Sequence, residues 1–201
     1  MKRTFFIMLL ATLVMQASAQ QLTTKQILDR AAQTVGTKTG VSAKFSFISA
    51  QTENVNGDIK LKGSKFRTTF RDMTVWFDGK TQWAYMKATD EVNISTPNAS
   101  QKARINPYTF IYLYKKGYTY SHQQQGQNYL VKLKAQDKSS AMKNIELTIR
   151  RKDFVPTQIR FEQGGKLYTI KIEQFKREAL NDRYFVFDRK QYPTAEIIDL
   201  R

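Results

Sequence analysis

His122 is the only histidine in this chain of 201 residues, and the chain has no cysteine. These counts exclude a metal site built from several histidines, a thiolate zinc site, a thiol nucleophile and a disulfide scaffold. No acidic residue adjoins His122, so we interpret it as an exposed loop residue and not as a general base. Asp137, Asp153 and Asp182 are scattered in turn-like contexts, where capping is the usual role of aspartate.

The motifs of common enzyme classes are also missing from the sequence. There is no Gly-x-Ser-x-Gly elbow, no glycine-rich phosphate loop and no dinucleotide-binding fingerprint. Without a nucleophile–base pair or a metal or cofactor motif, the sequence predicts a protein that is not an enzyme. We expect no catalytic residue, no metal ligand and no cofactor, so the function must depend on binding.

The N-terminus has the three parts of a secretory signal peptide. Lys2 and Arg3 form a positive region, an apolar run follows from Phe5 to Met15, and a small-x-small pattern ends at Ala19. We expect cleavage after this alanine, which gives a signal peptide of residues 1–19 and a mature domain of residues 20–201. As a helix the apolar run spans about 16 Å, short of a hydrocarbon core of roughly 30 Å, so we expect no membrane anchor. Since no cysteine follows, the mature chain is expected to be soluble and not lipidated.

The chain is strongly basic, with 33 Lys and Arg residues against 17 Asp and Glu residues. Loss of Lys2 and Arg3 with the signal peptide lowers the formal charge from +16 to +14. An exported protein seldom meets nucleic acid, so we expect no nucleic-acid partner and take anionic membrane surfaces as the natural counter-charge. Many lysines alternate with apolar residues, and they are also explained as the solvated faces of amphipathic strands. Both interpretations stay open.

Apolar periodicity predicts one helix followed mostly by strands. Residues 23–36 place apolar residues at helical spacing between a threonine cap and a glycine stop. From Val41 the period changes to two, and a second helical segment is expected at Pro107–Lys116, with proline in its first turn. Strand patterns resume after it, apart from Gln123–Gln127, which we interpret as a loop. A count of about nine to eleven strands favours a barrel or a sandwich.

Asp78–Gly79 lies between two strand-like runs and is the strongest local hairpin signal in the chain. A two-residue turn there predicts that Trp76 pairs with Thr81, so that Trp76 and Trp83 share one face of the sheet. A second hairpin turn is expected at Gly164–Gly165. The aromatic residues of these strands either fill an ordinary core or line a cavity under an apolar lid, and the residues alone favour neither.

Several stretches, in order along the chain, resemble the LolA family of outer-membrane lipoprotein carriers. They are the first helix with the strand after it, the segment Gly57–Arg67, the hairpin DGKTQWAY at residues 78–85, the strand start at Glu91 with the helix start at Pro107, and the closing stretch 184–199. The resemblance covers nearly the whole mature chain.

This resemblance implies a mainly β fold, an incomplete antiparallel β-barrel with helices covering its open side around an apolar cavity for acyl chains. It implies a monomeric periplasmic carrier that takes acylated lipoproteins from an inner-membrane ABC transporter of the Lol type to an outer-membrane acceptor. The lipid-binding residues expected in the cavity or its lid are Phe45, Phe47, Phe66, Trp83, Tyr85, Phe110 and Leu113. A LolA-like module that binds another lipid or glycolipid, or that senses mislocalised lipoproteins, is the alternative.

The sequence departs from the family pattern just before the Phe66-Arg67 pair. Well-studied members have Lys-Arg-Pro there, and the arginine helps to hold the lid shut. The corresponding stretch in this chain is Lys62-Gly63-Ser64. We therefore expect the contact that holds the lid to be absent or to be made by other residues.

Overall fold

The computed structural model describes residues 21–49, 52–98, 101, 106–140 and 142–201. The predicted signal peptide, residues 1–19, lies outside the described residues. The helices are α1 (Thr24–Val35) and the 3-10 helices η1 (Pro107–Lys115), η2 (Asp182–Phe185) and η3 (Arg189–Gln191). The strands are β1 (Val41–Ser49), β2 (Thr52–Lys62), β3 (Lys65–Phe70), β4 (Met73–Phe77), β5 (Gln82–Met86), β6 (Glu91–Ser95), β7 (Tyr118–Gln125), β8 (Asn128–Ala135), β9 (Asn144–Arg150), β10 (Pro156–Gln163), β11 (Lys166–Arg177) and β12 (Glu196–Asp199).

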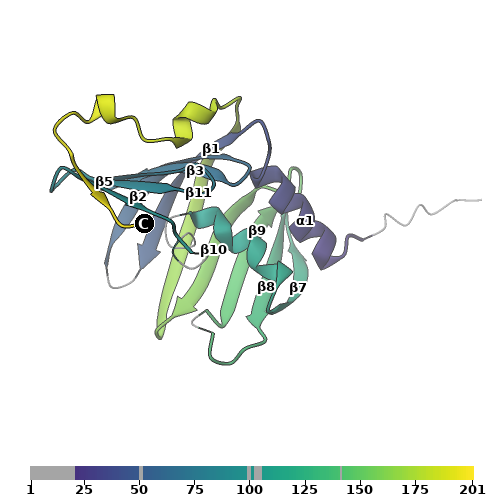
Figure 1. Ribbon diagram of the computed structural model, residues 1–201. Helices are drawn as coiled ribbons and strands as arrows, with labels where there is room; N and C mark the ends of the chain where they lie inside the picture. The colour runs from purple at the N-terminus through teal and green to yellow at the C-terminus, as the bar shows by residue number, and fades with distance from the viewer. Residues whose placement is uncertain (1–20, 50–51, 99–100, 102–105, 141) are drawn as a thin grey trace, which may run out of the picture.

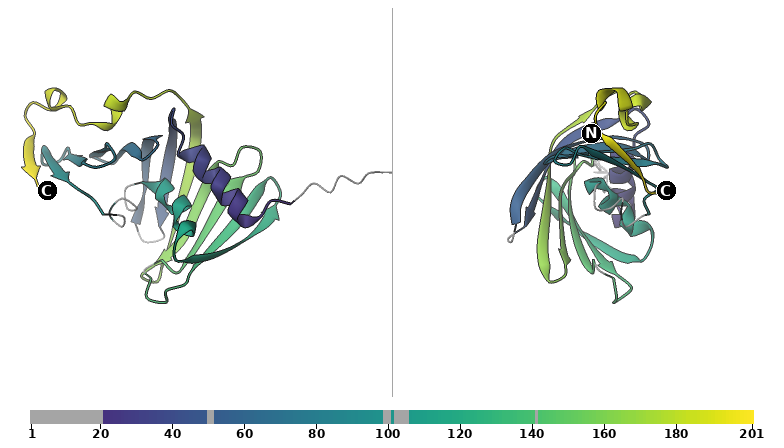
Figure 2. Two further views of the ribbon diagram at one scale, coloured as in Figure 1. Left: turned by 45° about the vertical axis from the view of Figure 1, so that its right-hand side comes forward. Right: turned by 60° about the vertical axis from the view of Figure 1, so that its left-hand side comes forward.

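All twelve strands of the described residues form one sheet in the order β12-β6-β5-β4-β3-β2-β1-β11-β10-β9-β8-β7 (Figure 1). The sheet curls without closing, because the end strands β12 and β7 do not pair. The right-hand view of Figure 2 shows it wrapping around α1 and η1, which lie on its concave side. The expected incomplete β-barrel with helices on its open side is therefore confirmed. Of the helices described, none is both long and apolar enough to cross a membrane.

The number and pairing of the strands differ in two details from the expectation. There are twelve strands in the described residues, one more than the upper expected number, and β12 pairs with β6 in parallel while the other neighbours are antiparallel. Both end strands carry weak sequence signals. Strand β12 has only four residues, and β7 includes Gln123–Gln125, part of the stretch interpreted as a loop. Backbone pairing with a neighbour is sufficient to place such polar residues in a strand.

Helix α1 begins with a threonine cap, as its sequence predicts, and this cap is part of a capping box. The Gln26 N–H donates to the Thr23 hydroxyl at 3.2 Å, and the Thr23 N–H donates to the Gln26 side-chain oxygen at 2.8 Å. The helix ends at Gly36, whose N–H donates to the Ala32 carbonyl. Its apolar side faces the sheet, with these buried residues: Ile27, Leu28, Ala31, Ala32 and Val35.

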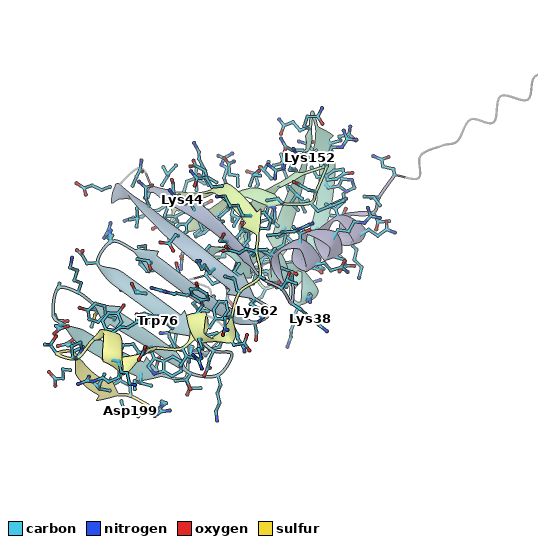
Figure 3. All side chains as sticks on the ribbon, turned by 90° about the horizontal axis from the view of Figure 1, so that it is seen from above. Lys38, Lys44, Lys62, Trp76, Lys152 and Asp199 are labelled. Atoms are coloured by element: carbon cyan, nitrogen blue, oxygen red, sulfur yellow. The ribbon has the colours of Figure 1, made fainter. Side chains whose placement is uncertain are left out.

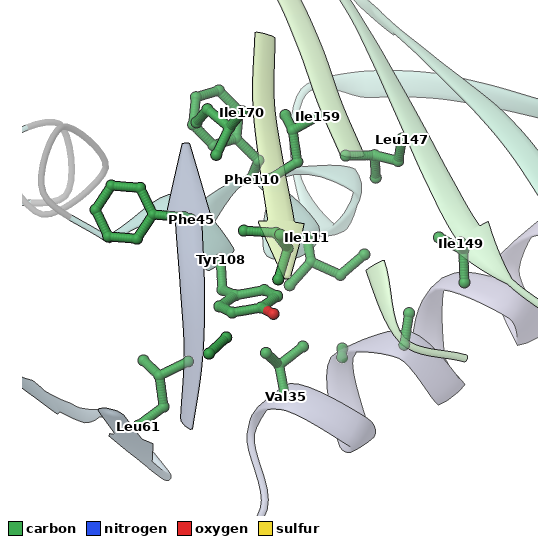
Figure 4. Packing of buried hydrophobic residues seen from close by; sticks show 14 of the residues in the cluster. Val35, Phe45, Leu61, Tyr108, Phe110, Ile111, Leu147, Ile149, Ile159 and Ile170 are labelled. Atoms are coloured by element: carbon green, nitrogen blue, oxygen red, sulfur yellow. The ribbon is translucent and has the colours of Figure 1, made fainter. Parts of the chain in front are cut away.

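The core lies between the concave face of the sheet and the two helices. Alternate strand residues point into it, so that Val41, Ala43 and Phe45 of β1 are buried while Lys44 between them is exposed. Side chains from α1, η1 and most strands join in one apolar cluster (Figure 4). Burial of each large side chain contributes about 1.5–3 kcal/mol, so covering this face provides most of the stability of the fold.

A β-bulge in β11 directs one aromatic ring toward the helices. Lys44 pairs with Glu173 and Ser42 pairs with Lys176, so β11 contains one residue more than β1 over this stretch. Gln174 accommodates it with a φ of 50°. Phe175 consequently packs against the core cluster, with its ring centroid 6.4 Å from that of Tyr108 in η1.

The turn between β4 and β5 is longer than the sequence predicts. Phe77 pairs with Gln82 and Trp76 pairs with Trp83, so the predicted pairing of Trp76 with Thr81 is wrong. The cause is the Asp78 carboxylate, which accepts the N–H groups of Lys80 and Thr81 at 2.8 Å and stabilises a wider loop. The two tryptophans still share one face, as expected. The turn at Gly164–Gly165 is confirmed, with both glycines at positive φ.

The C-terminal strap, residues 178–195, crosses the convex face of the sheet and carries η2 and η3 (Figures 2 and 3). Lysines of the β2–β3 hairpin hold its first part: Lys62 Nζ donates to the Leu180 carbonyl at 2.8 Å, and Lys62 and Lys65 both pair with the Asp182 carboxylate at 2.9 and 2.8 Å. Strand β12 then returns the chain to the sheet beside β6.

The close approach of two strands at Gly57 predicts the effect of a small side chain there. A Cβ atom on Gly57 would lie 2.5 Å from the Phe45 ring and 2.6 Å from the Thr69 carbonyl oxygen. We expect Gly57→Ala to lower the free energy of unfolding by about 1–3 kcal/mol, because a backbone atom cannot move aside cheaply. Urea denaturation measures this. The exposed neighbour provides the control, Asn56→Ala, for which a change within about 0.5 kcal/mol is expected; equal losses in both variants would contradict the steric explanation.

The ion pairs of the C-terminal strap predict that the free energy of unfolding depends on pH in the acid range. Hydrogen bonds from Lys65 and Lys62 lower the pKa of Asp182 from 3.8 to about 2. Since the pKa is lower in the folded state, the stabilisation is present at neutral pH and is lost as the pH falls from about 4 to about 2. The stability difference between the wild type and Asp182→Asn should therefore narrow over this range in urea titrations at successive pH values.

The control for this titration is Glu162→Gln, which removes an exposed carboxylate that has no ion pair among the described residues. It measures how the loss of one exposed carboxylate without an ion pair affects the stability difference from the wild type over this range. A difference for Asp182→Asn that narrows no more than that of this control would show that the lysine contacts do not hold the strap.

Candidate functional site

Helix η1 fills part of the concave face with its own side chains. The Phe110 ring lies 4.7 Å from the Phe161 ring of β10, measured between centroids, and Ile111 and Tyr108 are each about 1% exposed. Figure 4 shows Tyr108 and Ile111 between β1 and β11 of the sheet and Val35 of α1. The helix therefore occupies the position that a lid or plug of an apolar cavity would take.

Two features make η1 a weakly held plug. All nine of its residues are in 3-10 conformation, although such helices seldom exceed three or four residues because their hydrogen-bond geometry is poor. The buried Tyr108 hydroxyl has no hydrogen-bond partner among the described residues, and burial strongly raises its pKa. An unsatisfied buried hydroxyl costs about 1–3 kcal/mol. Part of the stability gained by burying the apolar side chains of η1 is thus lost again.

Helix η1 is attached to α1 by two tyrosine hydroxyls. Tyr114 Oη donates to the Asp29 carboxylate at 2.5 Å, and Tyr112 Oη donates to the Ala32 carbonyl at 3.2 Å. Hydrogen bonds from Lys25 and Tyr114 lower the pKa of Asp29, so this carboxylate is ionised at neutral pH. The contacts that hold η1 on α1 are therefore made by residues outside the Lys62-Gly63-Ser64 stretch.

The Lys62-Gly63-Ser64 stretch forms the turn between β2 and β3, with Gly63 at a φ of 58°. Its lysine binds the C-terminal strap on the convex side, through the Leu180 carbonyl and the Asp182 carboxylate.

Beside η1 the concave face carries an apolar strip of side chains that are only partly buried. Its members are Phe47, Phe70, Met73, Ala84 and Tyr168. Ring contacts connect the strip to the plugged region: Tyr168 lies 5.4 Å from Phe47 and 5.3 Å from Phe161, and Phe161 contacts Phe110 of η1. Displacement of η1 would therefore join the strip and the buried face into one continuous apolar surface.

Five of the seven predicted lipid-binding residues lie on this side of the sheet or in its plug. Phe45, Phe66 and Phe110 are buried members of the core cluster, and Phe47 and Leu113 pack against it. The structure thus brings these five together on the concave side.

Trp83 and Tyr85 lie on the opposite, convex face. Trp83 pairs with Trp76, which contacts Phe187 of the C-terminal strap, and Tyr85 lies 4.5 Å from Tyr192 of the strap. The sequence analysis missed Phe70, Tyr108 and Phe161 as parts of this side of the sheet. Alternation with Phe66 on β3 could have found Phe70. Tyr108 in η1 and Phe161 on β10 have no such signal, because no chosen residue alternates with them.

His122 lies in β7 and is half-buried, so its interpretation as an exposed loop residue is wrong. Its Nδ1 is 2.8 Å from the Thr24 hydroxyl at the start of α1, and its ring contacts Tyr129. The histidine thus helps to position α1 on the sheet. Within the described part of the chain, no three His, Cys, Asp or Glu side chains are grouped so that they could hold a metal ion.

Comparisons with known proteins agree with this architecture. Residues 12–165 match a family model described as outer membrane lipoprotein carrier protein LolA. A search of curated proteins finds no match. An uncharacterized conserved protein from Thermus thermophilus has a similar structure, with a TM-score of 0.61 at 17% identity over 87% of this chain and 98% of that chain. At this identity the likeness shows a shared fold.

A LolA superfamily protein from Nitrosomonas europaea is more distant, with a TM-score of 0.48 at 12% identity over 84% of this chain and 99% of that chain. A putative outer membrane lipoprotein-sorting protein domain from Vibrio parahaemolyticus has a TM-score of 0.46 at 11% identity, over 80% and 94% of the two chains.

The tyrosine contacts of η1 predict how the plug can be loosened. Tyr114→Phe removes the hydroxyl that binds Asp29, which should lower the free energy of unfolding by about 1 kcal/mol because the carboxylate keeps water and Lys25 as partners. Amide hydrogen exchange in residues 108–115 of η1 should become faster. The control is Tyr120→Phe. Tyr120 is an exposed neighbour whose hydroxyl has no hydrogen-bond partner in the described chain, so its removal should leave this exchange unchanged. Equal exchange in both variants would contradict the role of Tyr114.

Proposed function

The chain belongs to the LolA family of outer membrane lipoprotein carrier proteins, and on this premise we propose that it is a carrier that binds the acyl chains of lipoproteins. In this proposal it is exported to the periplasm and ferries lipoproteins from the inner to the outer membrane. It performs no chemical reaction, so that no residue acts as a catalyst.

The observation that carries the proposal is the weakly held plug on an apolar face. The side chains of η1 occupy space on the concave side that acyl chains would take, and the partly buried apolar strip beside η1 offers a first contact. An acyl chain that enters along Phe47 and Tyr168 meets the rings of Phe161 and Phe110 next. Displacement of η1 then lets apolar surface of the ligand replace apolar surface of the helix.

The energetics of such an exchange suit a carrier. Each buried CH₂ group of an acyl chain contributes about 0.8 kcal/mol, so that two or three full chains would exceed the limit of non-covalent affinity near ~20 kcal/mol. A carrier must release what it binds. The acyl chains have to displace the buried side chains of η1. The net gain is therefore only the difference between the apolar area that the ligand buries and the apolar area that η1 gives up. The net affinity is lowered, which allows the ligand to be passed on.

The proposed partners follow from this cycle. An inner-membrane ABC transporter of the Lol type would supply the acylated lipoprotein, and an outer-membrane acceptor would receive it. The convex face presents exposed lysines of β1, β8 and β11, namely Lys44, Lys132, Lys134 and Lys171. Such a basic surface favours transient contact with anionic membranes during transfer.

A charge in the apolar strip tests the proposal. We expect Phe47→Glu to weaken binding of a fluorescent triacylated lipopeptide by more than about tenfold, because a carboxylate buried beside an acyl chain has no partner. The fold should survive, since Phe47 is only partly buried. Ser46→Glu adds the same charge on the opposite face of the same strand and should leave binding unchanged. Unaltered binding by Phe47→Glu would contradict the assignment.

The identity of the ligand is tested by native mass spectrometry of the protein purified from its own cell envelope. A bound triacylated lipoprotein is the expected result. A bound free lipid or glycolipid would instead favour a carrier of another lipid on the same face. A protein that copurifies no acyl ligand and binds none in the lipopeptide titration would contradict the proposed function.

A further inference from the structure

A pocket of about 980 Å³ lies on the convex face, between strands β3 and β4 and the C-terminal strap. Its base is aromatic. Trp76 is only 4% exposed, and its ring lies 5.6 Å from that of Phe187 in the strap. In Figure 3 Trp76 lies close to the strap on this side of the molecule. The pocket is therefore separated by the sheet from the apolar strip on the concave face.

Four cationic side chains line this pocket, two from the sheet and two from the strap. They are Lys65, Arg67, Arg183 and Lys190. The Arg67 guanidinium lies over the Trp76 ring at 5.4 Å from its centroid, which orients the planar group at the base of the pocket. Basic groups thus approach the same space from opposite walls.

Two carboxylates also line the pocket, but both are already bound. Asp182 pairs with Lys62 and Lys65 at 2.9 and 2.8 Å. Asp188 accepts the Lys190 N–H at 3.0 Å and the side-chain amide of Gln191 at 3.1 Å at the start of η3. These bonds fix the shape of the strap and leave the carboxylates little freedom to turn toward other cations.

The remaining cations lack neutralising partners. Across residues 21–49, 52–98, 101, 106–140 and 142–201, no salt bridge involves Arg67, Arg183 or the Lys190 ammonium. Like charges that share a pocket repel each other, and an anion bound among them removes this repulsion. Arginine is suited to phosphate in particular, because its planar group donates two parallel hydrogen bonds to phosphate oxygens.

We propose that this convex-face pocket binds a ligand that carries a phosphate group. Arg67 and Arg183 hold the phosphate oxygens from the sheet and the strap, Lys190 adds charge at the rim, and the nonpolar part of the ligand lies against Trp76 and Phe187. The phosphate belongs either to a lipid headgroup or to a small soluble molecule. The site is independent of the proposed acyl-chain site, since the two lie on opposite faces of the sheet.

Fluorescence of Trp76 tests the proposal with inorganic phosphate as the probe. Trp83→Phe leaves Trp76 as the only tryptophan of the chain. Phosphate added at constant ionic strength, with chloride as the balancing anion, should change the emission in a saturable manner. We expect Arg67→Gln to weaken the binding by about tenfold, the usual effect of losing one charge-assisted hydrogen bond. Lys190→Gln should weaken it by about threefold, because an exposed charge at the rim contributes less.

The matched control is Lys44→Gln, which removes one positive charge from an exposed site on β1 away from the pocket. It should leave phosphate binding unchanged. Equal weakening by Lys44→Gln would overturn the proposal, because it would indicate a response to net charge. An emission that does not respond to phosphate would overturn it as well. Lys190 is exposed on η3, so its variant also keeps the test valid if Arg67→Gln disturbs Trp76.

Two further measurements identify the source of the phosphate, and either positive result supports the pocket. Glycerol 3-phosphate that binds more tightly than inorganic phosphate, in the same fluorescence titration, indicates a soluble ligand. Cosedimentation with phosphatidylglycerol vesicles that is weakened in Arg67→Gln but kept in Lys152→Gln indicates a lipid headgroup, because Lys152 is exposed between β9 and β10 and does not line the pocket. Phe47→Glu should keep phosphate binding in full, so that failure of the acyl-chain proposal does not imply failure of this one.

Discussion

The structure depends on one constraint, which is that the concave apolar face of an open sheet has to be covered. A closed small barrel fills its interior with its own strand residues. In this protein the end strands do not meet, and side chains of α1 and η1 complete the core instead. The two coverings differ in strength. Helix α1 has a capping box and a regular apolar side, whereas η1 is a long 3-10 helix that buries the Tyr108 hydroxyl without a partner in the described chain. In the proposed function, a ligand replaces the weaker covering, η1.

Because side chains alternate along the strands, the two faces of the sheet carry different kinds of residues. The concave face carries the apolar strip and the plugged core, while the convex face carries basic residues and the C-terminal strap. Because neighbouring residues of one strand point to opposite faces, Phe66 contributes to the core and Arg67 lines the convex pocket. Strand β3 therefore contributes to both sites, one on each face of the sheet. We expect a substitution at one site to have little effect on the other.

The order of the helices and strands could be predicted well because it depends on local patterns. The apolar spacing of α1, its threonine cap and its glycine end lie within about a dozen neighbouring residues. The hairpin at Gly164–Gly165 is equally local. Prediction failed where a distant or detailed contact decides the outcome. Strand β7 contains Gln123–Gln125 without apolar alternation and is held by its pairing with β8, and the Asp78 side chain widens a turn that the sequence suggested to be tight.

The sequence by itself determined the mainly β class, the family resemblance and which side chains share a face of a strand. It could not determine which of the two faces becomes concave, because a period of two treats both faces alike. Trp83 and Tyr85 illustrate this: their alternation is correct, yet the tertiary structure places them on the convex face that the C-terminal strap crosses, and away from Phe66. That choice follows from the curl of twelve paired strands and from the helices that cover one side, and both depend on contacts between residues far apart in the chain.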